Sequence, residues 1–316
     1  MKYTKKTSIE EIRATHDVVI GWGNSIVQFE RFYNPALYKL DGLINGQSRN
    51  VGKTVCGYTI NPPEYLERFA GKRICVIIYP NIENECLEQI GKIAPEADSI
   101  VGRLVDNKLS HQEFYASDAE DRIFLHLLEK LGITDPYYMD IGVCHPVVAN
   151  NTYLLYEKGL KHGILVEPNP VMAGLAKEYR PDNQLLNVGV TAGENGILKY
   201  CSGVRPGRNY FLREGAAPEE GYRVMELPVL NINQILKENG CEDLDLLDID
   251  IEGMDYEVLN AIDFDKYRIR IVCAEYRNRY GTGDMDCMMN EKGYIHWMST
   301  RENHIYLRKE LLEQIK

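Results

Sequence analysis

Long apolar stretches are the first thing that this sequence lacks. No apolar run approaches about 18 residues, the length that a membrane-spanning helix needs. Residues 1–6 carry charge, but the apolar core of a signal peptide does not follow them. We therefore expect no membrane span and a cytoplasmic location.

The cysteine and histidine spacing of a metal site is also lacking. The chain has eight cysteines, but they are scattered, with no C-x-x-C pair and no histidines at zinc spacing. Reduced thiols in an intracellular protein are the expected state. We predict no zinc site.

Positive charge is scarce relative to negative charge. The chain has 36 lysines and arginines against 47 aspartates and glutamates, a net charge of −11. This balance argues against nucleic acid or an anionic membrane as the main partner. What is present is the composition of an ordinary globular protein, with 44% apolar residues.

With 316 residues, the chain is long enough for two domains. Residues 105–116 form a polar connector, and before it short apolar strands such as 74–78 alternate with helices. We predict a small Rossmann-like α/β domain at residues 1–112 and a larger α/β domain with a doubly wound sheet at residues 113–316.

A glycine pair in the first domain resembles part of a dinucleotide turn. Gly21 and Gly23 follow a strand and precede a helix expected at 24–33. Ile26, however, occupies the third glycine position, and the next strand ends at Asn45 rather than at an acid. A structural, partner-binding or substrate-contacting role is favoured. A nicotinamide-dependent oxidoreductase is the alternative.

Two strands of the second domain each lead into a carboxylate. The first strand, at 138–141, carries Asp140 and turns at Gly142, and the second, at 163–166, is followed by Glu167. Ligands of a doubly wound sheet bind at the carboxyl ends of its strands. An acid after the second strand is placed to accept hydrogen bonds from ribose hydroxyls.

The single glycine of the first turn changes the expected cofactor. A dinucleotide site has G-x-G-x-x-G, whereas Gly142 stands alone and follows Asp140. A carboxylate there would repel a pyrophosphate but would suit the cationic amino group and sulfonium of S-adenosylmethionine (SAM). We predict SAM as the cofactor. The alternative role of Asp140 is to cap the helix expected from about Val147.

A row of acids near the fourth strand, expected at 244–251, is the second candidate for chemistry. Asp248, Asp250 and Glu252 would share one face of a strand that should be apolar on both faces. We predict that Asp250 and Glu252 act beside the methyl group, where a carboxylate can accept the proton of an attacking hydroxyl. In the simplest alternative the strand ends at Asp248 and the acids are solvated. A divalent metal is a further alternative that we do not predict, with the oxygen donors Asp248, Asp250, Glu252, Asp255 and Glu275.

Three further residues near these strands each have two interpretations. His145, in the first loop, is a candidate general base or a loop histidine that bonds a backbone carbonyl. Cys144 is expected to be a small packed residue rather than a nucleophile. Asn187, on a third strand expected at 185–190, is a candidate for contact with an adenine edge or a structural residue.

Less regular parts of the second domain complete the expected elements. Ser117 and Glu120 form a capping-box pattern before an apolar helical face. An irregular section at 196–229, with two strand-like pieces, is expected to hold substrate-facing loops, and 281–288 is expected to be a turn. An antiparallel strand pair would close the sheet.

Several short motifs of the second domain, taken together in this order, are specific for one protein family. They are Asp140-Ile141-Gly142, Pro146, Asn151-Thr152, Glu167-Pro168-Asn169-Pro170 and Ile249-Asp250-Ile251-Glu252-Gly253. The set resembles the FkbM-like SAM-dependent methyltransferases over about residues 120–310. Cys144 stands where this family more usually has asparagine, and Asp248 where a lysine or small polar residue is expected.

The resemblance implies a SAM-dependent methyltransferase that acts on an oxygen of a sugar or other polyhydroxylated metabolite. The acceptor would be a small molecule or glycan. A non-catalytic scaffold that keeps the methyltransferase fold is the alternative from another class of protein. The expected cofactor contacts come from Asp140, Gly142, Val143, Glu167, Pro168 and Asn187.

Overall fold

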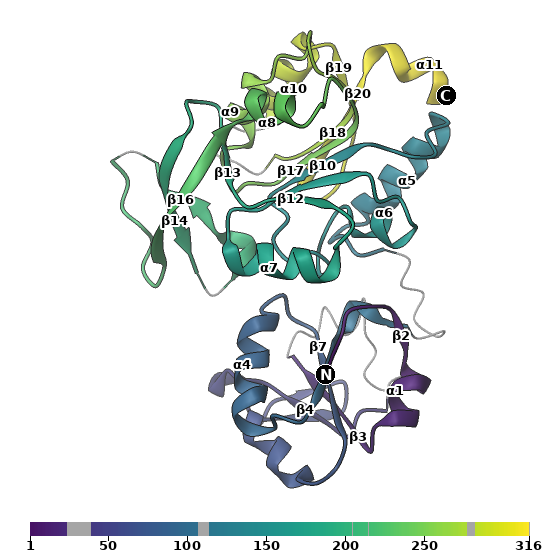
Figure 1. The fold of residues 1–316 in the computed structure, drawn as a ribbon, viewed down its shortest axis with the longest axis vertical. Helices are drawn as coiled ribbons and strands as arrows, with labels where there is room; N and C mark the ends of the chain where they lie inside the picture. The colour runs from purple at the N-terminus through teal and green to yellow at the C-terminus, as the bar shows by residue number, and fades with distance from the viewer. Residues whose placement is uncertain (24–38, 107–113, 204, 214, 277–281, 316) are drawn as a thin grey trace. The chain divides into compact units, whose positions relative to one another are not determined.

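The computed structural model describes residues 1–23, 39–106, 114–203, 205–213, 215–276 and 282–315. The chain forms two compact units, Met1–Glu113 and Phe114–Lys316 (Figure 1). Each unit combines a largely parallel sheet with helices, so both are α/β.

The first unit is built on a seven-stranded sheet in the order β1-β8-β7-β3-β4-β6-β5. All neighbours pair in parallel except β5 and β6, which form an antiparallel hairpin. Its strands are β1 (Lys2–Tyr3), β3 (Val18–Trp22), β4 (Gly42–Ile44), β5 (Thr54–Val55), β6 (Tyr58–Asn61), β7 (Ile74–Ile78) and β8 (Asp98–Val101). A separate parallel pair joins β2 (Thr7–Ser8) and β9 (Val105–Asp106).

The described helices of the first unit are α1 (Ile9–Thr15) and α4 (Glu83–Ile93), with 3₁₀ turns at Ser48–Asn50, Pro63–Phe69 and Gly102–Leu104. The helix expected at 24–33 lies outside the described residues. Gly21 lies inside β3, where an added Cβ would approach the side chains of Leu40, Leu43 and Tyr79 at 2.8–3.0 Å. Close packing therefore accounts for this glycine without a nucleotide.

The main sheet of the second unit has the order β12-β11-β10-β17-β18-β20-β19. The first five strands are parallel and the last two form the expected antiparallel closing pair. The strands are β10 (Tyr138–Ile141), β11 (Gly163–Val166), β12 (Gln184–Leu186), β17 (Asp243–Ile249), β18 (Arg268–Glu275), β19 (Tyr294–Ser299) and β20 (Asn303–Arg308).

Helices cover both faces of this sheet (Figure 1). Apolar side chains of α8, α9 and α10 share a buried cluster with Met139 and Ile141 of β10. Those of α5, α6 and α11 pack against Tyr138, and α7 packs against Leu165 of β11. The helices are α5 (Glu120–Lys130), α6 (Tyr153–Glu157), α7 (Pro170–Tyr179), α8 (Ile232–Glu238), α9 (Asp255–Ala261), α10 (Thr282–Glu291) and α11 (Leu312–Ile315).

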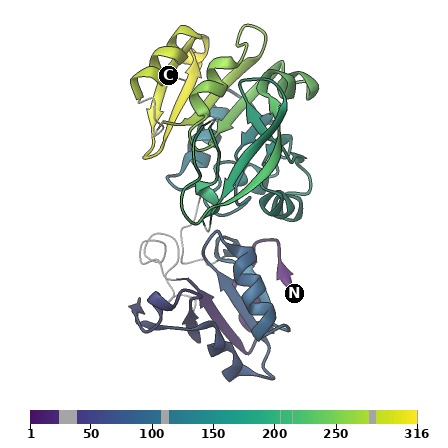
Figure 2. The same cartoon turned by 90° about the vertical axis from the view of Figure 1, so that its left-hand side faces the viewer.

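The section at 196–229, expected to be irregular with two strand-like pieces, forms most of a second, four-stranded sheet. Its order is β13-β16-β14-β15, and β14 pairs with β16 along seven residues. This pair faces the viewer in Figure 2. The strands are β13 (Gly189–Thr191), β14 (Gly196–Ser202), β15 (Tyr210–Phe211) and β16 (Arg223–Asn231), with a 3₁₀ turn at Pro206–Arg208.

Three local expectations are wrong. The third strand divides into β12 and β13, which join different sheets, and Asn187 lies between them. The helix after β10 begins at Tyr153 rather than near Val147. Residues 282–291 are helical rather than a turn.

The capping box at Ser117 also fails. Helix α5 begins after Ala119, which has a left-handed backbone. Glu120 instead accepts hydrogen bonds from the Thr300 hydroxyl and the Asn303 amide, so its carboxylate is used in tertiary contacts. Among the described residues, no helix is long and apolar enough to cross a membrane.

Candidate active site

The loops after β10 and β17 touch at the carboxyl edge of the main sheet. Gly142 has φ +91°, and a Cβ added there would lie 1.8 Å from the backbone oxygen of Asp250. The Asp250 amide donates to the Ile141 carbonyl at 2.9 Å, and the Gly142 amide donates to the Val166 carbonyl at 2.9 Å. Glycine is required here because both the backbone conformation and the close approach exclude a side chain.

Asp140 lies in a buried network under the first loop. Its Oδ2 accepts hydrogen bonds from the Thr152 hydroxyl at 2.5 Å and the Asn150 amide at 3.3 Å. The guanidinium of Arg180, itself fully buried, lies 3.6 Å from the same oxygen. These partners hold the 142–152 loop against the sheet.

Asp248 lies beside Asp140 on the neighbouring strand, since the two residues pair directly in the β10–β17 register. Burial raises the pKa of both carboxyl groups, and the charge of Asp140 raises that of Asp248 further. Arg180 offsets this effect for Asp140. We therefore assign the charge to Asp140 and a proton to Asp248, which accepts a hydrogen bond from the Asn151 amide at 3.3 Å.

Glu167 connects the loops that follow β10 and β11. Its two oxygens accept backbone hydrogen bonds from Cys144 at 2.8 Å and from Asn169 at 2.7 Å. The side chain is buried, and burial raises the pKa of its carboxyl group to about 7. Each oxygen keeps a further lone pair for a hydroxyl donor.

The acids after β17 differ in their surroundings. Asp255 caps the turn, because its oxygens accept from the Ile251 amide at 3.0 Å and the Gly253 amide at 3.1 Å. Asp250 and Glu252 are half-buried rather than solvated. Burial, followed by the negative charge of Glu275, is the main cause of their raised pKa values. The pKa of Asp250 is raised well above its usual range and that of Glu252 to about 8. Glu252 also has a left-handed backbone, φ +55°.

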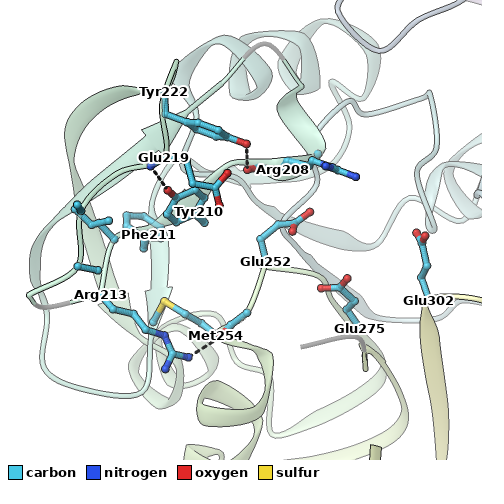
Figure 3. A pocket seen from close by; sticks show the side chains of 15 residues that line it. Arg208, Tyr210, Phe211, Arg213, Glu219, Tyr222, Glu252, Met254, Glu275 and Glu302 are labelled. Carbon is cyan, nitrogen blue, oxygen red and sulfur yellow. Dashed lines mark hydrogen bonds between the residues drawn. The ribbon is translucent and has the colours of Figure 1, made fainter. Parts of the chain in front are cut away.

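A cavity of about 570 Å³ opens beside Glu252 (Figure 3). The carboxylates of Glu252 and Glu275 face its interior together with the guanidinium of Arg208. Aromatic rings of Tyr210 and Tyr222 form the opposite wall. The remaining lining residues are Gly207, Phe211, Leu212, Arg213, Ala216, Ala217, Glu219, Gly253, Met254 and Glu302.

The cavity wall is fastened to the loop after β17. Arg213 donates to the Gly253 carbonyl at 2.9 Å and to the Glu257 carboxylate at 2.8 Å. The Tyr210 hydroxyl accepts from the Glu219 amide at 3.0 Å. The second sheet thus supplies one wall of the cavity and the carboxyl edge of the main sheet supplies the other.

Residues 140–295 match the family model of the methyltransferase FkbM domain. The matched residues lie within the second unit. The match begins at Asp140 and ends in β19, so it contains Glu167, Glu252 and the second sheet. Comparison with curated proteins and with solved structures gave no match.

Two residues of the first loop of the FkbM domain have packing roles. His145 is fully buried, and its Nδ1 accepts from the Val147 amide at 3.2 Å and the Val148 amide at 3.1 Å. This placement favours the loop-histidine interpretation, with backbone amides rather than a carbonyl as partners. Burial raises the pKa of the Cys144 thiol, so the thiol stays protonated, as expected of a packed residue.

The other expected cofactor residues lie around Glu167. Val143 packs with Leu165, while Pro168 is half-buried beside Glu167. The Asn187 amide donates to the carbonyls of Glu167 and Pro168 at 2.7 Å and 3.1 Å. Asn187 therefore braces the loop after β11 from outside.

The expected acid cluster of the FkbM domain does not converge on a metal site. Asp255 faces backbone amides, and Asp248 faces Asn151 and Asp140. Within the described ranges, a single group of three or more His, Cys, Asp or Glu side chains lies close enough together to share an ion. It consists of Asp286, His296 and His304.

The contacts of Arg180 and Asn150 with Asp140 were not predicted from the sequence. Arg180 follows directly after α7, and the fold brings its side chain back to β10 across 40 residues. A buried carboxylate implies a cationic partner, but the sequence does not say which arginine supplies it.

Proposed function

We propose that the second unit is a SAM-dependent methyltransferase that methylates an oxygen of a sugar or other polyhydroxylated metabolite. We further propose that its main sheet is a doubly wound, Rossmann-like methyltransferase sheet and that the two units are separate domains. The observation that carries the function is the meeting of the loops after β10, β11 and β17 at one sheet edge, which holds Asp140, Glu167 and Glu252. A cavity opens beside this edge, and the residues match the FkbM domain.

The donor set of this edge suits a cationic nucleoside. The edge holds three carboxyl groups, those of Asp140, Glu167 and Asp250. Burial is the largest cause of the raised pKa of each. A bound cation would compensate that burial, whereas a pyrophosphate would aggravate it. When bound, SAM supplies an electrophilic methyl group.

Each expected cofactor residue has a role in this proposal. Glu167 would accept hydrogen bonds from the ribose hydroxyls, and the backbone of Gly142 and Val143 permits close approach. Asp140 would attract the amino group, directly or through water, while it keeps the loop in place. Pro168 and Asn187 would lie on the adenine side.

Glu252 is the proposed general base. Its carboxylate faces the cavity, and its pKa of about 8 is close to the operating range of a base at neutral pH. In the proposed step an acceptor hydroxyl gives its proton to Glu252, and its oxygen forms the new bond to the methyl carbon. Asp250 lies on the same loop, beside the proposed position of the methyl group, and His145 positions the first loop.

Methyl transfer from labelled SAM to a panel of sugars and polyols tests this proposal. We expect label in at least one acceptor, and Glu252→Gln should lower kcat by about 100-fold or more because the base is lost. The matched control Glu226→Gln changes an exposed acid on β16 and should leave kcat unchanged. If Glu252→Gln and wild type transfer label equally fast, Glu252 is not the base. If wild type transfers none to the whole panel, the proposed acceptor class is wrong.

A further inference from the structure

Three side chains from three elements converge away from the proposed methyltransferase site. They are Asp286 of α10, His296 of β19 and His304 of β20. One potential ligand atom from each lies within 4.8 Å of the others. Two imidazoles and one carboxylate are a donor set typical of transition-metal sites.

The sheet register and ring stacking hold the two histidines. His304 is buried and pairs with Ala274 and Ser299 in the neighbouring strands. Its ring stacks on His296, with centroids 4.1 Å apart, and on Tyr276, with centroids 4.0 Å apart. The imidazoles are therefore fixed before any ligand arrives.

Both histidines direct the same nitrogen to the carboxylate. The Nδ1 atoms of His296 and His304 each lie 3.2 Å from an oxygen of Asp286. Two ligands of one tetrahedral zinc ion, with bonds of about 2.0–2.1 Å, lie about 3.3 Å apart. The two separations between a histidine nitrogen and a carboxylate oxygen, to Oδ2 for His296 and to Oδ1 for His304, match those of ligands that share one ion.

Neighbouring hydroxyl groups orient two of the three side chains. The Ser299 hydroxyl lies 2.9 Å from Nε2 of His296, and the Tyr306 hydroxyl donates to Asp286 at 2.7 Å. When Nε2 donates to Ser299, the lone pair of His296 Nδ1 is directed toward Asp286. Such outer partners are typical of metal-binding histidines and carboxylates.

We propose that Asp286, His296 and His304 bind one divalent transition-metal ion, with zinc as the best match. Imidazole donors disfavour magnesium and calcium, which prefer oxygen ligands. His296 and Asp286 are partly exposed, which leaves a path for the ion and a position for water. This proposal does not depend on the proposed methyltransferase function.

The ion would fasten α10 to the β19–β20 hairpin. One residue, Asn303, separates His304 from Glu302, which lines the cavity beside Glu252. Asn303 also pairs with Glu275, another residue that lines this cavity. The metal site and the cavity are thus adjacent at the start of β20. We assign the ion a structural role and no step in methyl transfer.

The test is a titration of the reduced full-length protein with Zn²⁺ and with Co²⁺. We expect one equivalent of each ion to bind, with the visible spectrum of four-coordinate Co²⁺ and nitrogen and oxygen ligands. Asp286→Asn and His296→Gln should each weaken binding by at least about 10-fold. His296 is exposed, so its replacement should leave the fold intact.

Two controls separate this site from other donors. Cys287→Ser removes the exposed thiol next to Asp286, and His162→Gln removes an exposed histidine elsewhere. Both variants should bind the ion as wild type does. The proposal is overturned if wild type binds neither ion, if His296→Gln and Asp286→Asn bind unchanged, or if Cys287→Ser abolishes binding.

Discussion

Asp140 and Asp248 are neighbouring buried carboxyl groups that differ in their partners. Asp140 has a cation, Arg180, at 3.6 Å, while Asp248 has an amide and a second carboxyl group beside it. If a substitution removes the negative charge of Asp140, Arg180 remains as a buried cation without a compensating charge. A protonated carboxyl group, by contrast, has nearly the shape and charge of an amide.

Asparagine replacements at the two positions should therefore differ sharply. At neutral pH, Asp140→Asn should lower the free energy of unfolding by about 3–5 kcal/mol. Asp248→Asn should change it by less than about 1 kcal/mol, because the native group already holds a proton. Urea unfolding measures both. Equal losses in the two variants would contradict this assignment of charge.

The departure at Cys144 has a backbone consequence. Cys144 has φ +51°, a left-handed conformation that asparagine adopts more readily than other residues with a side chain. The asparagine more usual at this position of the family suits that conformation. The sequence revealed the departure, but the backbone angle behind it could be seen only in the structure.

At the scale of elements, the contact between the loops after β10 and β17 determines the shape of the site. Gly142 combines a left-handed backbone with the approach to Asp250. Gly159, after α6, has nearly the same backbone, φ +89°, but an added Cβ would meet nothing within 4 Å. Comparing substitutions at these two glycines therefore distinguishes the effect of backbone strain from that of steric clash.

Alanine at each position should reveal the difference. Gly159→Ala should cost about 1–2 kcal/mol of stability from the left-handed backbone alone. Gly142→Ala should cost more and should also weaken SAM binding, because the two loops must separate. Chemical denaturation and SAM titration of both variants measure these effects. Similar losses of stability and unchanged SAM affinity would show that the loop contact is unimportant.

Strongly patterned elements were predictable from the sequence. The apolar runs predicted β10, β11 and β17, and the glycine and the acids placed the candidate site at their carboxyl ends. Boundaries set by tertiary contacts were not predictable. Glu120 accepts hydrogen bonds from Thr300 and Asn303 instead of capping α5. The strand β13 pairs with β16 of the second sheet rather than with the main sheet.

At the scale of the molecule, the second unit contains several carboxyl groups with raised pKa values. Burial raises those of Asp121 and Asp255 to about 6, Glu167 to about 7 and Glu252 to about 8. The unfolded values are about 4. Between the two values the folded chain holds more protons than the unfolded chain, so stability falls as pH rises.

The melting temperature of the ligand-free protein should therefore fall by several degrees between about pH 5 and about pH 8. His304 acts in the opposite direction, because burial lowers its pKa, but it is one group against four. Scanning fluorimetry over this range measures the sign. A melting temperature that rises with pH would mean that these carboxyl groups are not buried as described.

The most direct test of the whole account is calorimetric titration of the full chain with SAM. We predict one site whose affinity rises by up to about tenfold from pH 6 to pH 8, as Glu167 loses its proton. Glu167→Gln should weaken binding by about 10-fold or more and abolish this pH dependence, with circular dichroism as the check of its fold. Absence of SAM binding to wild type, or equal affinity in Glu167→Gln, would contradict the account.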